Sequence, residues 1–175
     1  AKGLHREALE ALERARQRAP HRPMLQTLIG ETHLALRDWR AAEQAFDATL
    51  DIDELSPQAH LGLAIALLHQ GRTERAVELA LETIWLRFHY PMAHYVLGLA
   101  LVRLGEPRRA EEAWRTAVTQ APGFIRAHRL LLWLYRRLLS DPQQAADQQA
   151  QLAMARRRRR STAPPASAES ESADP

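Results

Sequence analysis

The sequence predicts an all-α protein: a solenoid of antiparallel helix pairs with about nine helices. Three observations lead to this prediction. The sequence repeats itself when it is shifted by 34 residues, apolar residues within a repeat recur every three or four positions, and Gly or Pro separates the apolar runs. Such spacing is typical of a helix with one buried face. A single helix pair cannot bury its own apolar face, so we expect the pairs to stack.

The repeat is clearest in columns of proline, alanine and histidine. Proline begins three units, at Pro23, Pro57 and Pro91. An Ala-His pair follows at the same spacing, at Ala59-His60, Ala93-His94 and Ala127-His128. Between the two helices of a unit, Gly71 and Gly105 suit a helix end, and Pro107 suits the first turn of the next helix. The columns therefore predict unit boundaries near residues 23, 57, 91 and 125.

The elements at the N-terminal end follow from these boundaries. Residues 1–22 are expected to hold the second helix of a truncated repeat, because residues 4–18 have helical spacing with no partner helix before them. Since the chain starts inside a repeat, and at Ala1 rather than Met, we expect it to be part of a longer protein. Complete repeats are expected at residues 23–56, 57–90 and 91–124.

The C-terminal elements are less regular. Residues 125–160 are expected to form a degenerate capping helix pair, because few large apolar residues besides Leu152 and Met154 follow residue 142. Residues 161–175 contain mainly Ser, Ala, Pro and acidic residues, with nothing large and apolar to bury. We expect this segment to be a disordered acidic tail.

The units resemble the tetratricopeptide repeat (TPR), a helix-turn-helix motif of the same length. Residues 91–124 match the motif best, at Leu97, Gly98, Leu101, Gly105, Ala110, Trp114, Ala117 and Pro122. The two preceding units match more loosely, since Arg37 replaces the turn glycine and Ala80 replaces a bulky residue. The resemblance covers residues 1–155 and implies a right-handed superhelical solenoid whose first helices line a concave groove.

The composition and motifs argue against catalysis. The chain has no Cys, which removes disulfides, thiolate catalysis and cysteine metal sites. His60, His94 and His128 cannot share a zinc ion, because equivalent positions on stacked helix pairs lie about 10 Å apart. We expect these imidazoles to pack between helices. Phosphate-binding loops, nucleophile motifs and paired catalytic carboxylates are not found, so we expect no enzyme activity, no metal and no cofactor.

The predicted function is that of a scaffold that binds a peptide or partner segment in its concave groove. Side chains expected to face the groove, and to contact the partner, are Met92, Tyr95, Leu99, Arg103, Arg126, Arg129, Trp133 and Arg137. Leu61 and Ile65 are expected to continue this surface toward the N-terminus. Because the groove is apolar in the middle and cationic at its C-terminal end, the expected partner is a protein or peptide with apolar and acidic residues.

An alternative is that the chain is the C-terminal regulatory region of a larger bacterial enzyme. Residues 88–95 resemble repeats found behind phosphodiesterase domains of the alkaline phosphatase superfamily. Nucleic-acid binding is not expected, although the arginine run from Arg156 to Arg160 could contact phosphates, because no aromatic side chains interleave it for base stacking. No apolar run approaches the ~20 residues that span a bilayer, and no secretion signal opens the chain, so we expect a cytoplasmic location.

Overall fold

The computed structural model describes residues 2–161, and this part of the chain forms nine α-helices and no strand. The helices are α1 (Lys2–Arg18), α2 (Pro23–Leu36), α3 (Trp39–Leu50), α4 (Pro57–His69), α5 (Thr73–Leu86), α6 (Pro91–Arg103), α7 (Pro107–Gln120), α8 (Ile125–Arg137) and α9 (Pro142–Ser161). The predicted all-α architecture is confirmed. The predicted disordered tail, apart from Ser161, lies outside the described residues.

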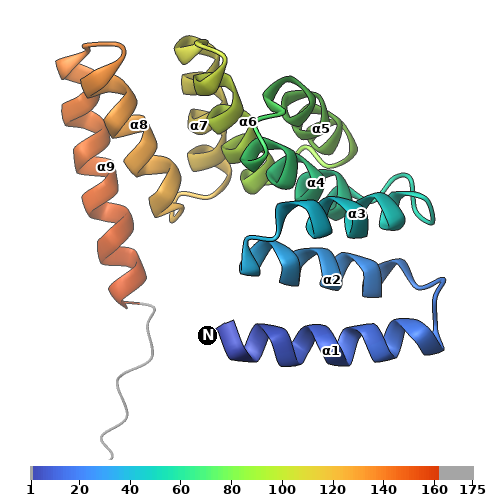
Figure 1. Ribbon diagram of the computed structural model, residues 1–175. Helices are drawn as coiled ribbons and strands as arrows, with labels where there is room; N and C mark the ends of the chain where they lie inside the picture. The colour runs from blue at the N-terminus through green and yellow to red at the C-terminus, as the bar shows by residue number, and fades with distance from the viewer. Residues whose placement is uncertain (1, 162–175) are drawn as a thin grey trace, which may run out of the picture.

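The helices follow one another along an arc, with α1 at one end and α9 at the other (Figure 1). Each helix packs against the next one in the chain, and α4 also contacts α2 and α6. These contacts link the first helices of successive pairs. The result is an all-α solenoid. The division into repeat units at residues 23, 57, 91 and 125 stays a prediction, although Pro23, Pro57 and Pro91 do each begin a helix.

The turn inside each of the first three complete pairs contains a residue in the left-handed backbone region. Gly71 and Gly105 have φ values of 84° and 77°. Arg37 occupies the same place between α2 and α3 with a φ of 63°. A glycine enters this region without steric cost, whereas the Cβ atom of Arg37 crowds its own backbone. The turn geometry is thus kept even where the sequence departs from the glycine.

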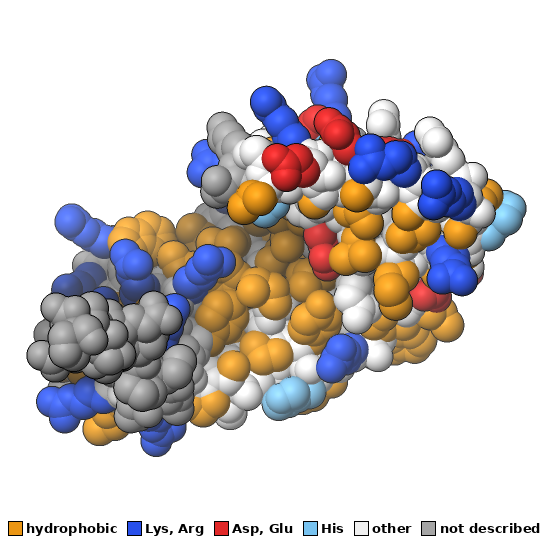
Figure 2. Space-filling model, turned by 90° about the horizontal axis from the view of Figure 1, so that it is seen from below, with side chains coloured by type: hydrophobic (Ala, Val, Ile, Leu, Met, Phe, Trp, Pro, Cys, Tyr) orange, Lys and Arg blue, Asp and Glu red, His pale blue; other side chains and the backbone are white. Residues whose placement is uncertain are grey.

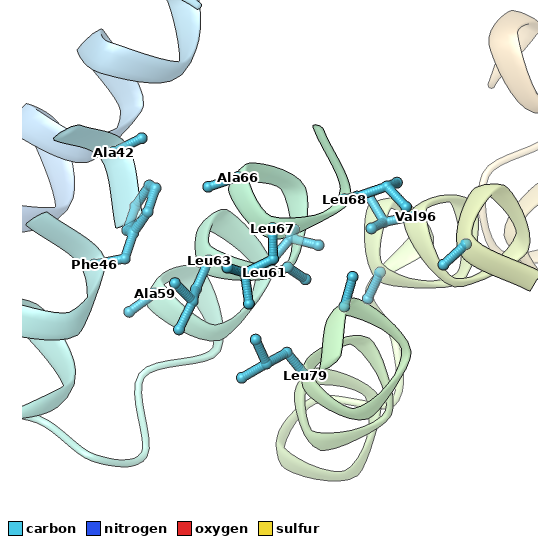
Figure 3. Close-up of a cluster of buried hydrophobic side chains, with 14 residues drawn as sticks. Ala42, Phe46, Ala59, Leu61, Leu63, Ala66, Leu67, Leu68, Leu79 and Val96 are labelled. Atoms are coloured by element: carbon cyan, nitrogen blue, oxygen red, sulfur yellow. The ribbon is translucent and has the colours of Figure 1, made fainter. Parts of the chain in front are cut away.

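The core depends on close contact between a bulky ring on a second helix and glycines on first helices. Figure 3 shows this ring, Phe46, within the central cluster of buried side chains. The Phe46 ring of α3 lies against two glycines. A Cβ atom at Gly30 of α2 would come within 2.8 Å of that ring, and one at Gly62 of α4 within 2.2 Å. Phe46 is fully buried. Because it contacts glycines of both α2 and α4, it joins its own helix pair to the next one.

Trp114 of α7 repeats this arrangement farther along the arc. A Cβ atom at Gly98 of α6 would lie 2.3 Å from the indole nitrogen of Trp114. That nitrogen donates a hydrogen bond to the carbonyl oxygen of Tyr95 at 3.0 Å. In the pair α4–α5 the sizes are reversed, because the second helix carries the small, fully buried Ala80 in place of a ring. Leu97 and Leu101 of α6 pack against Ala80 and fill the volume that a ring would occupy.

A ring contact also joins the turn of one pair to the end of the next first helix. Trp39, the first residue of α3, stacks on His69 at the end of α4, with ring centroids 4.0 Å apart and planes 9° from parallel. Beside this contact, Gln70 donates a hydrogen bond to the Glu43 carboxylate at 2.8 Å. Both contacts fix α3 against α4.

We predict that Gly98→Ala destabilises the fold by ~1 to 3 kcal/mol, because the new methyl group overlaps the Trp114 indole in a packed core. The expected result is a clear drop in melting temperature by circular dichroism. Gly3→Ala is the matched control, since no atom lies within 4 Å of a Cβ at that position of α1. Equal melting temperatures for Gly98→Ala and wild type would contradict the assigned contact.

We predict that Arg37→Gly stabilises the fold by about 1 kcal/mol, since glycine relieves the left-handed strain of a non-glycine residue. Urea unfolding should show a higher midpoint. The control is Gln44→Gly, an exposed position in the middle of α3, where glycine should destabilise by about 1 kcal/mol. A lower midpoint for Arg37→Gly would show that the arginine side chain contributes more than the strain costs.

Candidate functional site

The candidate site lies on the hollow side of the arc, where α8 meets α6 and α9. In the view of Figure 2, hydrophobic side chains line the hollow between the two ends of the molecule, and basic side chains lie at both ends, including the α8–α9 end. One depression of about 300 Å³ is lined by Tyr95, Arg126, Arg129, Leu130 and Trp133. A second, of about 310 Å³, is lined by Arg129, Leu132, Trp133, Arg136, Arg137, Leu152 and Arg156. Both contain Arg129 and Trp133, and we call the two depressions together the Trp133 groove.

The helical spacing of α8 explains why Trp133 faces outward. The buried face of α8 contains Ala127, His128, Leu131, Leu134 and Tyr135. The exposed positions Arg126, Arg129, Trp133 and Arg137 recur every three or four residues on the other face. Trp133 is 42% exposed, although a tryptophan is usually well buried. The outward direction of Trp133 is therefore a direct consequence of the amphipathic pattern of α8.

The structure brings five of the eight predicted contact residues to the groove. Tyr95, Arg126, Arg129 and Trp133 line the first depression, and Arg137 lines the second. The Tyr95 ring packs on Phe124, with centroids 5.0 Å apart. Burial raises the pKa of the Tyr95 hydroxyl, which the positive charge of Arg126 partly offsets, so this hydroxyl stays protonated near neutral pH.

The other three predicted residues lie outside both depressions. Met92 and Leu99 are half-buried and pack against the central core cluster. The guanidinium of Arg103 donates a hydrogen bond to the Leu68 carbonyl oxygen, which holds this side chain against α4. None of these three residues lines the groove. Their role in binding stays a prediction.

The expectation for one residue on the N-terminal side of the groove is wrong. Leu61, predicted to face the hollow, is only 6% exposed and belongs to the central core cluster. The reason is the position of α4 in the middle of the arc, where α2, α3, α5 and α6 all contact it. A helix enclosed in this way is apolar on most of its surface, and helical spacing alone does not show which face points to the hollow.

The charge of the groove is largely uncompensated within the described residues. Arg126, Arg129, Arg137 and Arg156 form no ion pair with a described carboxylate, whereas the arginines of α5 and α7 form several. Arg136 donates a hydrogen bond to the Gln149 amide at 2.5 Å. A cluster of cations beside an exposed indole suits a ligand with both carboxylates and apolar side chains.

Sequence reasoning missed the contribution of α9. Leu152 and Arg156 line the second depression together with Leu132 and Arg136 of α8. A signal was present, because the buried residues of α9 recur at helical spacing, at Ala145, Gln148, Leu152 and Ala155. Arg156 is the residue after Ala155, at the edge of this face. The first arginine of the run thus belongs to the groove.

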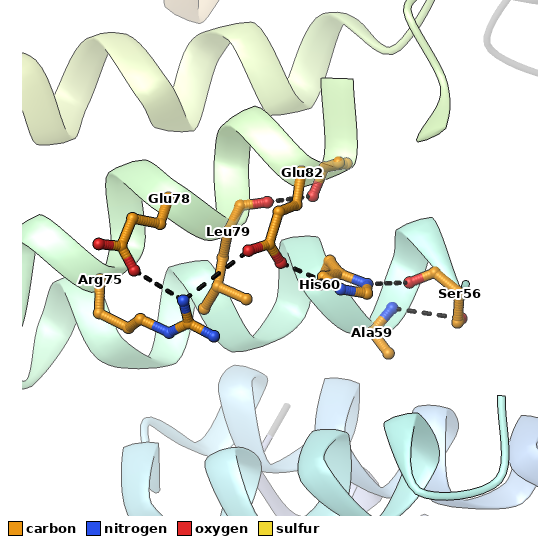
Figure 4. Close-up of polar contacts among 8 residues, drawn as sticks. Ser56, Ala59, His60, Arg75, Glu78, Leu79 and Glu82 are labelled. Carbon is orange, nitrogen blue, oxygen red and sulfur yellow. Dashed lines mark hydrogen bonds and ion pairs between the residues drawn. The ribbon is translucent and has the colours of Figure 1, made fainter. Parts of the chain in front are cut away.

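The histidine column has a structural role. Each imidazole hydrogen-bonds a backbone carbonyl just before its own helix: His60 to Ser56 at 3.0 Å, His94 to Phe88 at 3.2 Å and His128 to Pro122 at 3.0 Å. Because a carbonyl oxygen only accepts, the bonded ring nitrogen carries the proton. Each ring also contacts a following helix, as His60 does through Glu82 at 3.2 Å (Figure 4).

These imidazoles therefore fix the entry of α4, α6 and α8. Over residues 2–161, no group of three or more His, Asp or Glu side chains is placed to hold a metal ion. In the same residues, no helix has the length and apolar character needed to cross a bilayer.

The fold and the groove define a class of protein: a helix-pair solenoid with an exposed concave surface, which supports a role as a protein-interaction scaffold. The chain belongs to the tetratricopeptide repeat family, whose model matches residues 27–84 and 95–164.

Solved structures support the fold assignment. A crystal structure of MamA is 22% identical to this chain, with a TM-score of 0.78 and coverage of 91% of this chain and 93% of that one. TTC0263, a thermophilic TPR protein of Thermus thermophilus, is 20% identical, with a TM-score of 0.68 and coverage of 87% and 91%. YrrB, a TPR protein with an unusual peptide-binding site, is 14% identical, with a TM-score of 0.68 and coverage of 89% and 79%.

We predict that the fold loses stability as the pH falls from about 8 to about 5 and that His94 contributes to this loss. Burial lowers the pKa of His94 below 6.5, and the hydrogen bond to the Phe88 carbonyl only partly offsets this effect. The unfolded chain then binds more protons, so the contribution is present above pH 6.5 and is lost as the pH falls through the lower pKa of the folded state. The pKa of His69 shifts in the same direction, again mainly through burial.

The measurement is the melting temperature at the two pH values for wild type and for His94→Gln. The expected result is a smaller pH-dependent drop in His94→Gln, since glutamine does not titrate. An identical drop in both proteins would show that other groups account for the pH dependence.

Proposed function

We propose that this chain binds a protein segment with apolar and acidic side chains in the Trp133 groove. The observation that carries the proposal is the exposure of Trp133 between two depressions and among arginines that lack described ion-pair partners. Trp and Arg are the residue types that most often contribute a large share of binding energy at protein interfaces. An aromatic anchor surrounded by cations fits a partner that inserts aliphatic side chains and presents carboxylates around them.

The two residue types have different tasks in this proposal. Trp133, supported by Tyr95, covers apolar side chains of the partner and excludes water from them. A buried aromatic anchor is worth ~2 kcal/mol or more. Arg126, Arg129 and Arg137 are exposed, and each exposed ion pair contributes below ~1 kcal/mol. The indole therefore determines the dissociation rate of a partner, while the arginines raise its association rate and select acidic sequences.

The similarity to YrrB is compatible with this proposal, since peptide binding occurs on a related fold. The same groove would serve the alternative role, as the regulatory region of a larger enzyme, with the partner segment then modulating that enzyme. That alternative stays a prediction from the sequence.

We predict that Trp133→Ala and the arginine variants weaken binding in different ways. The probe is a peptide selected from a random display library against the full chain and measured by surface plasmon resonance. Trp133→Ala should raise the dissociation rate about tenfold or more at every salt concentration, because the anchor is lost. Arg126→Ala and Arg129→Ala should mainly slow association, and this loss should shrink as salt rises.

Matched controls use the same residue types away from the groove. Trp85→Ala removes an indole of α5 that is 82% exposed, and Arg40→Ala removes an exposed arginine of α3. Both should leave the rates unchanged. If the selected peptides bind the Trp133 and arginine variants as they bind wild type, the proposed groove is not the binding surface.

A further inference from the structure

An exposed segment of this chain has the chemistry that the Trp133 groove requires. Residues 51–55, between α3 and α4, have the sequence Asp51-Ile52-Asp53-Glu54-Leu55, and we call them the acidic loop. All five residues are exposed, with Ile52 at 41% and Leu55 at 65%. No described cation forms an ion pair with the three carboxylates. The loop therefore offers two aliphatic side chains and three exposed negative charges to a partner.

The acidic loop and the groove lie at different ends of the same molecule. In Figure 1 the loop that joins α3 to α4 projects at the right, while α8 and α9 form the left end of the arc. A rigid solenoid cannot bring these two surfaces together within one copy. Any contact between them must join two molecules.

We propose that the acidic loop of one copy docks in the Trp133 groove of a second copy. This inference rests on the proposed function, and it names the partner as the chain itself. Ile52 and Leu55 enter the two depressions beside Trp133, each of which is about 300 Å³ in volume. Asp51, Asp53 and Glu54 then face the arginines at the groove, which include Arg126, Arg129 and Arg156.

The geometry of such a contact determines the form of the assembly. The two surfaces differ, so the contact is head-to-tail and leaves one free loop and one free groove in every dimer. Further copies add to both ends. Because the charges are exposed, the assembly should be sensitive to salt as well as to protein concentration.

The test uses the full chain in sedimentation velocity over a range of protein and salt concentrations. Wild type is expected to form species that grow with concentration and shrink with salt. A groove variant, Arg129→Gln with Trp133→Ala, and a loop variant, Asp53→Asn with Glu54→Gln and Leu55→Ala, should each raise the dissociation constant about tenfold or more. Circular dichroism confirms that both variants fold, and Arg40→Gln with Trp85→Ala is the matched control that keeps wild-type assembly.

Mixing the two variants gives the decisive result. The groove variant still carries a working loop, and the loop variant still carries a working groove. An equal mixture should therefore form a one-to-one complex with the wild-type dissociation constant, and it should stop there because no second pair of working surfaces remains. A mixture that stays monomeric while wild type assembles would overturn the proposal.

Other results identify other occupants. If wild type stays monomeric at all concentrations, the self-association proposal is wrong. If assembly survives the loop changes but is lost in Glu169→Gln with Glu171→Gln and Asp174→Asn, the occupant is the C-terminal tail of a second copy, and the loop proposal is overturned. Binding of library peptides to the loop variant tests the groove separately, so failed self-association and failed peptide binding are distinguishable.

Discussion

The architecture depends on one steric constraint, the contact of an aromatic ring with a backbone that carries no side chain. Phe46 lies closely against Gly30 and Gly62, which belong to first helices of successive pairs. The Phe46 ring therefore sets the distance between α2 and α3 within one pair and the distance from α3 to α4 of the next pair. Trp114 likewise sets the distance between α6 and α7 through its contact with Gly98. A solenoid has few long-range contacts to correct an error, so its local spacings determine its overall curve.

The position of a helix along this arc determines whether its outer face is buried or exposed. The central helix α4 has neighbours on most of its surface, and nine of its 13 residues are buried. Helix α8 lies near the end, with α7 and α9 as its main neighbours, so one whole face remains open. The same first-helix pattern thus produces core in the middle and an exposed surface at the end. The groove therefore lies near the end of the stack, where no further helix pair of the described residues covers the outer face of α8.

Much of this could be predicted from the sequence, because the repeat has a fixed period and each column has a steric meaning. The helices, their proline starts and the outward face of α8 all follow from spacing. The sequence did not show that Leu61 is enclosed, since burial there depends on neighbouring pairs rather than on α4 itself. It also did not show that Arg156 joins the groove, because that requires α9 to lie beside α8. Arg37 takes a glycine-like conformation because the helices on both sides impose the turn.

The four tryptophans have a consequence for optical work on this molecule. They fall one to each helix pair: Trp39 on α3, Trp85 on α5, Trp114 on α7 and Trp133 on α8. Their surroundings differ, since Trp39 stacks on His69, Trp85 is 82% exposed, Trp114 is fully buried and Trp133 is 42% exposed. Indole emission shifts to longer wavelength in water, so the four residues emit at different wavelengths. Because Trp114 is the fully buried indole among the four, a shift of the summed emission to longer wavelength on unfolding reports mainly on the opening of α6 and α7.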